Sequence, residues 1–117
     1  MPFLRHYANG VSVGAVELGE ELTIGRSQDN TIVLDDGTVS ARHATVCKRG
    51  NQYVMVDSDS TNGIQYNGKK VREHVFQEND IVTIGTHDFE YVLNLPQAFE
   101  QTLKIKKSWI PGVYYTE

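Results

Sequence analysis

A chain of 117 residues with 39% hydrophobic side chains can build one core but not two, so the sequence predicts a single domain. Its net charge of −4 argues against nucleic acid as a partner, and no run of about 18 apolar residues is present that could span a membrane. The single cysteine, Cys47, excludes an internal disulfide and a cysteine-based metal cage.

The expected compartment follows from the N-terminus and from cysteine usage. Residues 1–6 lack the charged and then apolar pattern of a secretory signal. A lone cysteine fits a reducing compartment. We therefore expect a cytoplasmic protein with no membrane partner.

Short β-rich segments separated by turn residues run along the chain, whereas few windows show helical spacing. The expected strands are residues 11–18, 22–24, 31–34, 43–47, 52–56, 64–66, 80–84 and 89–93. The alternation of the first segment changes register near Gly14, which indicates a β-bulge. Asn67-Gly68 predicts a tight hairpin that returns through Val71.

This pattern predicts an all-β fold. About eleven short strands in roughly 95 residues are typical of a β-sandwich of two antiparallel sheets. We expect the domain to cover residues 1–95. Pro96 ends the last strand, and residues 96–117 are interpreted as a C-terminal tail or linker.

Four short motifs occur in order in the loops between these strands. They are Gly25-Arg26, Ser40-Ala41-Arg42-His43, Ser60-Thr61-Asn62-Gly63 and Asn67-Gly68. Each motif alone is weak, but their order and spacing resemble the forkhead-associated (FHA) domain family over roughly residues 18–93. The resemblance implies an eleven-stranded FHA-type β-sandwich that binds phosphothreonine peptides through the loops at one end.

The resemblance also implies which residues contact the ligand. A phosphothreonine carries about −1.5 to −2 charges and three strong acceptor oxygens, so its site needs a cation and several rigid donors. Arg26 matches the phosphate-facing arginine of the family. Ser40 matches the serine whose hydroxyl and backbone N–H donate to the phosphate, and Thr61 completes the cradle. Asn62 matches the asparagine that holds the backbone of the bound peptide.

Three further residues are expected to support the site. By resemblance, His43 is buried behind the loops and braces them without touching the ligand. Gly25 and Gly63 supply backbone freedom where a side chain would crowd the loops. Ala41 departs from the family, which often has a basic or amide residue there, and Arg42 is the candidate for an additional phosphate contact.

The expected function is therefore a non-catalytic signalling module that recruits a phosphothreonine-containing protein or peptide, such as a Ser/Thr kinase substrate or the kinase itself. The alternative is a phospho-independent interaction scaffold with a weakened phosphate site. Ala41 leaves room for that alternative. Taken alone, Arg26 could simply form a surface salt bridge with Asp29 or Asp36, and Thr61-Asn62-Gly63 could be a plain turn.

Neither an enzyme nor a metal site is expected. Ser40 and His43 lie three residues apart, but no third acid orients them for nucleophilic catalysis. His6, His74 and His87 have no ligand spacing with Asp, Glu or Cys, so we expect them to face solvent or to lie at strand ends. No cofactor is expected.

Overall fold

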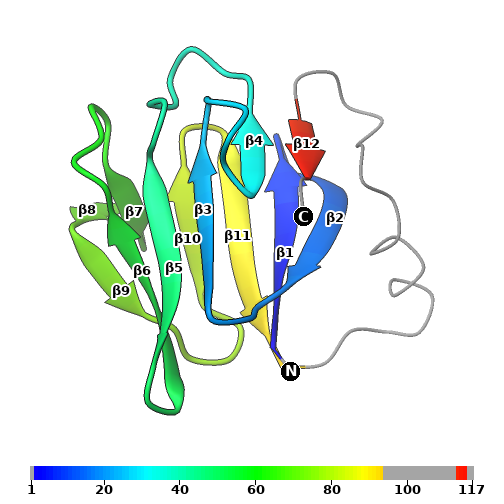
Figure 1. Ribbon diagram of the computed structural model, residues 1–117, viewed down its shortest axis with the longest axis vertical. Coiled ribbons are helices and arrows are strands. Elements are labelled where there is room, and N and C mark those ends of the chain that lie inside the picture. The colour runs from blue at the N-terminus through cyan, green and yellow to red at the C-terminus, as the bar shows by residue number, and fades with distance from the viewer. Residues whose placement is uncertain (1, 94–112, 116–117) are drawn as a thin grey trace.

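The computed structural model describes residues 2–93 and 113–115 and contains two six-stranded sheets that form a sandwich (Figure 1). Sheet A has the order β2-β1-β11-β10-β7-β8, and sheet B has the order β12-β4-β3-β5-β6-β9. The strands of sheet A are β1 (Phe3–Ala8), β2 (Val11–Glu17), β7 (Ile64–Tyr66), β8 (Lys69–Val71), β10 (Ile81–Ile84) and β11 (His87–Val92). Those of sheet B are β3 (Glu21–Gly25), β4 (Ile32–Leu34), β5 (Ala44–Arg49), β6 (Gln52–Asp57), β9 (Glu73–Val75) and β12 (Val113–Tyr115). Strands β1 to β11 confirm the predicted eleven-stranded all-β sandwich.

The expectation that both sheets are antiparallel is wrong for sheet B, because β3 and β4 pair in parallel through Ile24↔Ile32 and Gly25↔Val33. The loop between them turns back over only six residues, 26–31. Thr23 and Thr31 hold its base, since each backbone N–H donates to the other residue's hydroxyl oxygen, at 3.1 and 3.0 Å. Alternation along a strand is the same in both pairings, so the sequence does not reveal this direction.

The C-terminal segment contributes a strand to sheet B. Val113–Tyr115 pair antiparallel with β4 at the edge of the sheet, in the register Val113↔Leu34 to Tyr115↔Ile32. The boundary predicted at residue 95 and the rest of the predicted tail lie outside the described residues. Within the described residues, no helix is long and apolar enough to cross a membrane.

Two local predictions are confirmed. The β1–β2 register passes from His6↔Gly14 to Tyr7↔Ser12, which leaves Val13 as the extra residue of a bulge. The β7–β8 hairpin closes at Asn67 and Gly68, both with positive φ, 53° and 77°. Two positive φ values in a two-residue loop match the twist of the flanking strands, and Asn-Gly adopts them at low cost.

The expectation that His6 faces solvent or lies at a strand end is wrong, because His6 lies inside β1 and is 0% exposed. His87 does lie at a strand end, as the first residue of β11, but it is buried, at 5% exposure. His6 Nε2 and His87 Nδ1 are 2.9 Å apart and share one hydrogen. The His6 ring also stacks on Phe89, with 4.6 Å between the ring centroids. His74 is half-buried on β9, where its Nε2 lies 2.8 Å from Asp80 Oδ2.

Burial of His6 makes folding stability depend on pH. Burial, and then the neighbouring His87, lower the pKa of His6 from 6.5 to about 3. Between these two pH values His6 is protonated in the unfolded chain but not in the folded chain. The contribution of His6 to stability is therefore complete above pH 6.5 and is lost as the pH falls towards 3.

We predict that urea unfolding shows a loss of up to ~2 kcal/mol between pH 7 and pH 5. His6→Gln removes the titrating ring but keeps a hydrogen-bonding amide, so most of that loss should disappear. For each protein, the free energy of unfolding at pH 7 is the reference for its value at pH 5. An equal loss in both proteins would show that other groups cause the acid sensitivity.

Candidate functional site

Four connections lie together at one end of the sandwich, the upper end in Figure 1. They are the β3–β4 loop (26–31), the β4–β5 loop (35–43), the β6–β7 loop (58–63) and the β10–β11 turn (85–86). All predicted site residues lie in the first three loops or, like Gly25, directly beside them. The fold thus brings together motifs that are far apart in the sequence.

A cavity of about 130 Å³ opens between these loops. It is lined by all four residues predicted to contact the ligand, together with one stretch of the β4–β5 loop. The lining residues are Arg26, Gly37, Thr38, Val39, Ser40, Thr61 and Asn62. A cation, hydroxyl groups and an amide therefore surround a single space.

Ser40 lies where three loops meet. Its backbone oxygen accepts the Arg26 N–H at 2.9 Å, and its Oγ accepts the Thr61 N–H at 3.0 Å. Its own backbone N–H donates to His43 Nδ1 at 3.1 Å. Because His43 engages that N–H, the hydroxyl hydrogen is the donor that Ser40 has available in this arrangement.

His43 is fully buried and connects the β4–β5 loop to the β6–β7 loop. Since Nδ1 accepts from Ser40, Nε2 carries the hydrogen and donates to the Gly63 carbonyl at 2.7 Å. The His43 backbone continues the link, because its N–H donates to Ile24 O and its carbonyl accepts from Ser58 N–H, each at 2.9 Å. His43 does not line the cavity.

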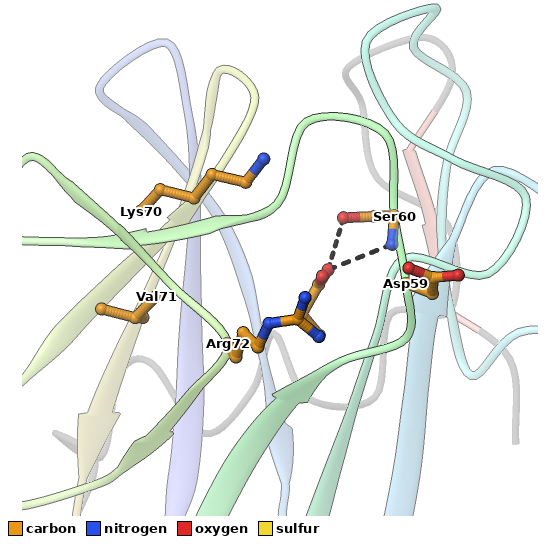
Figure 2. Close-up of a pocket in the computed structure, with 6 residues that line it drawn as sticks. Asp59, Ser60, Lys70, Val71 and Arg72 are labelled. Carbon is orange, nitrogen blue, oxygen red and sulfur yellow. Dashed lines mark hydrogen bonds between the residues drawn. The ribbon is translucent and has the colours of Figure 1, made fainter.

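The β6–β7 loop is folded by its own side chains (Figure 2). The Asp57 carboxylate accepts from both the hydroxyl and the backbone N–H of Ser60, and Ser60 Oγ accepts the Gly63 N–H at 2.8 Å. Gly63 has φ +74°, and a Cβ there would come within 2.9 Å of Lys70 Cγ. Asn62 donates from Nδ2 to the Thr38 carbonyl of the β4–β5 loop at 2.8 Å.

A larger cavity of about 340 Å³ lies on the outer side of this loop, towards β8. Its lining is Asp57, Asp59, Ser60, Lys70, Val71 and Arg72, all drawn in Figure 2. The two carboxylates balance the two cations there, so this surface has no net charge.

The two arginines of the motifs have different surroundings. Arg42 Nη2 donates to Asp29 Oδ2 at 2.6 Å, and Arg42 does not line the cavity. The pKa of Asp29 lies below its ordinary value because the Ser27 hydroxyl donates to it and Arg42 lies beside it. Among residues 2–93 and 113–115, no carboxylate is recorded within 4 Å of the exposed Arg26 guanidinium. The salt bridge weighed for Arg26 with Asp29 or Asp36 is therefore not formed.

Comparison with known protein families matches residues 22–85 to the FHA domain. The chain belongs to the FHA-domain family. One relative, the glycogen accumulation regulator GarA of Mycolicibacterium smegmatis, is 43% identical over 61 residues, which is 52% of this chain and 39% of GarA. The chain spans less than half the length of the curated relatives that it matches.

Solved FHA structures resemble this FHA domain along most of its length. One, from a structural and functional analysis of phosphothreonine-dependent FHA domain interactions, has a TM-score of 0.70 at 26% identity and covers 81% of this chain and 98% of its own. Mycobacterium tuberculosis EmbR in complex with a low-affinity phosphopeptide has a TM-score of 0.70 at 29% identity, covering 82% of this chain and 25% of EmbR. This FHA domain is a non-catalytic binding module.

Sequence reasoning missed the buried amide that holds the β3–β4 loop of this FHA domain. Asn30 is 0% exposed, and its Nδ2 donates to Ser27 O at 2.8 Å and to Ala41 O at 2.7 Å. Gly25 permits this approach, because a Cβ there would come far inside contact distance of the Ala41 carbonyl and 2.8 Å from Asn30 Nδ2. In the sequence, Asp29-Asn30 looks like an ordinary turn, so no local signal reveals the role.

Gly25→Ala should lower the stability of the domain, since the Ala41 backbone must shift to admit a methyl group. Overpacking of this kind costs about 1–3 kcal/mol. Gly19→Ala is the control, because nothing lies within 4 Å of a Cβ at Gly19. Urea unfolding of both variants measures the difference. Equal stabilities would mean that the two loops can separate freely.

Proposed function

We propose that this FHA domain binds phosphothreonine-containing protein segments in the cavity between its loops. The observation that carries the proposal is that Arg26, Ser40, Thr61 and Asn62 line one cavity although they come from three loops. The similarity to FHA structures studied with phosphothreonine or phosphopeptide ligands supports it.

Each lining residue has a separate role in the proposal. Arg26 supplies the permanent charge, and its guanidinium has no competing carboxylate among the described residues. The hydroxyl groups of Ser40 and Thr61 donate to the phosphate oxygens. Asn62 holds the backbone of the bound segment, while His43 and the two glycines support the loops from behind.

Arg42 is a weaker contributor in this arrangement. Its ion pair with Asp29 joins two side chains that are 60% and 58% exposed. Such surface pairs contribute about 0.2–1 kcal/mol, so a ligand could displace Asp29 at small cost. Without that displacement, Arg26 is the cation that contacts the phosphate and Arg42 adds only long-range attraction.

The partner is then a protein phosphorylated on threonine, such as a Ser/Thr kinase substrate or the kinase itself. A cytoplasmic location agrees with this partner and with the lone cysteine. The alternative, a phospho-independent scaffold, is favoured by one observation: Ala41 and Arg42 add no second cation to the cavity lining.

Arg26→Ala should weaken binding of a phosphothreonine peptide, selected from a degenerate library by its affinity for the wild type. Loss of a charge-assisted hydrogen bond costs about 1.5–3 kcal/mol, or roughly ten- to a hundred-fold in Kd. Arg42→Ala removes the same charge outside the cavity and should change Kd by less than about threefold. Calorimetry on each variant measures this.

The same peptide without its phosphate separates the two functions. A phosphate-dependent module does not bind the unphosphorylated peptide, whereas a phospho-independent scaffold binds it as tightly as the phosphorylated one. Undiminished phosphopeptide binding by Arg26→Ala would contradict the proposal that this cavity binds the phosphate group.

Phosphothreonine should bind more tightly than phosphoserine. Val39 is the one lining residue with a purely aliphatic side chain, so we expect the γ-methyl group to pack on that side of the cavity. Burying one methyl group is worth about 0.8 kcal/mol, or roughly fourfold in Kd. Fluorescence anisotropy with two peptides that differ only in this methyl group measures the ratio. A ratio of one would indicate a general anion site.

A further inference from the structure

Asp36 organises the β4–β5 loop although it does not line the cavity. Its Oδ1 accepts both the backbone N–H and the hydroxyl of Thr38, each at 2.8 Å. These donors, the backbone one first, hold the pKa of Asp36 below its usual value, so the group is a carboxylate at neutral pH. Thr38 itself lines the cavity. The Asp36 carboxylate therefore holds a residue that lines the cavity, although Asp36 does not line it.

The second oxygen of Asp36 faces the β10–β11 turn. Thr86 Oγ1 donates to Oδ2 at 3.3 Å, and His87 Nε2 lies 3.5 Å away. His87 is held on its other side by the buried His6, at 2.9 Å. At Gly85 the turn comes so near the loop that a Cβ would lie 2.6 Å from Thr38 Oγ1. Asp36 thus ties the loop to the core of the sandwich.

Thr38 transmits this anchoring to a residue of the proposed site. Its carbonyl accepts the Asn62 Nδ2–H at 2.8 Å. An amide with one N–H engaged keeps its oxygen and its second N–H in fixed directions. The direction in which Asn62 meets a ligand is therefore set by where Asp36 holds Thr38.

We propose that Asp36 is a positioning residue of the phosphothreonine site, acting through Thr38 on Asn62 and anchored by Thr86 and His87. The proposal rests on the proposed function. For the affinity of Asp36 variants, this proposal predicts a change opposite to the one that simple electrostatics predicts. Removing a negative charge near a phosphate site should strengthen phosphopeptide binding, whereas loss of positioning should weaken it.

Asp36→Ala is expected to raise the Kd of the library-selected phosphothreonine peptide by about tenfold, because two hydrogen bonds that hold the loop are lost. Asp35→Ala is the matched control. Asp35 is the neighbouring residue and its side chain is exposed, so this variant removes the same charge without removing the contacts of Asp36. It should leave Kd unchanged or lower it slightly. Asp36→Asn keeps an oxygen acceptor for Thr38 and should restore most of the affinity.

A double-mutant cycle distinguishes positioning from general destabilisation. If Asp36 acts through Thr38 on Asn62, then Asp36→Ala should cost less than about twofold in an Asn62→Ala background. Calorimetry is carried out well below the unfolding temperature of each variant. If Asp36→Ala does not fold, Asp36→Ser replaces it, because serine can accept from the Thr38 N–H but cannot reach the β10–β11 turn. Asp36→Ser is expected to cost about threefold.

Three results would overturn the proposal: wild-type affinity in the Asp36 variant used, an affinity gain equal to that of Asp35→Ala, or full additivity with Asn62→Ala. Failure of the proposed function looks different. In that case the wild type would bind the phosphorylated and unphosphorylated peptides alike, and Arg26→Ala would have no effect. If Arg26→Ala abolishes binding but the Asp36 variants bind normally, only the positioning role is wrong.

Discussion

The hydrogen bond from His43 Nε2 to the Gly63 carbonyl, at 2.7 Å, is the contact on which the geometry of the site depends. It crosses from the β4–β5 loop to the β6–β7 loop, and His43 is fully buried, so water cannot take the place of either partner. The opposite ring nitrogen accepts the Ser40 N–H. One neutral ring therefore sets the spacing between Ser40 on one loop and Thr61 on the other.

At this site, buried polar groups hold the loops in place, whereas exposed polar groups are the ones available to a ligand. His43 and Asn30 are each 0% exposed and hold backbone groups, whereas Arg26, Thr61 and Asn62 are exposed around the cavity. Removing a buried bracing group leaves its partners unsatisfied, which lowers stability, while removing an exposed group mainly changes what the cavity binds. Stability and affinity are thus separable at this site. The loops keep a defined shape although Val39 is their one residue in the hydrophobic core cluster.

The sequence was informative where local chemistry decides structure and uninformative where distant partners do. Asn67-Gly68 requires two positive φ values, so its hairpin was predictable, and the ordered loop motifs indicated four of the seven residues that line the cavity. Strand β1 was missed because His6 points inward while Phe3 and Tyr7 point outward, which hides the usual alternation. His6 was expected to face solvent or to lie at a strand end, because its hydrogen-bond partner, His87, is 81 residues away. The parallel β3–β4 pair and the role of Asn30 likewise depend on contacts that leave no local pattern.

An acidic chain can still present a site for an anion, because three aspartates at the loop end are engaged by groups other than Arg26. Asp29 is paired with Arg42, Asp36 accepts from Thr38, and Asp57 accepts from Ser60. Each is engaged by these other groups, and none of them forms an ion pair with Arg26. The loops at this end carry two arginines against four aspartates, so the site does not depend on a net positive charge of its surroundings. What favours an anion there is one guanidinium, that of Arg26, which lines the cavity without a carboxylate partner among the described residues.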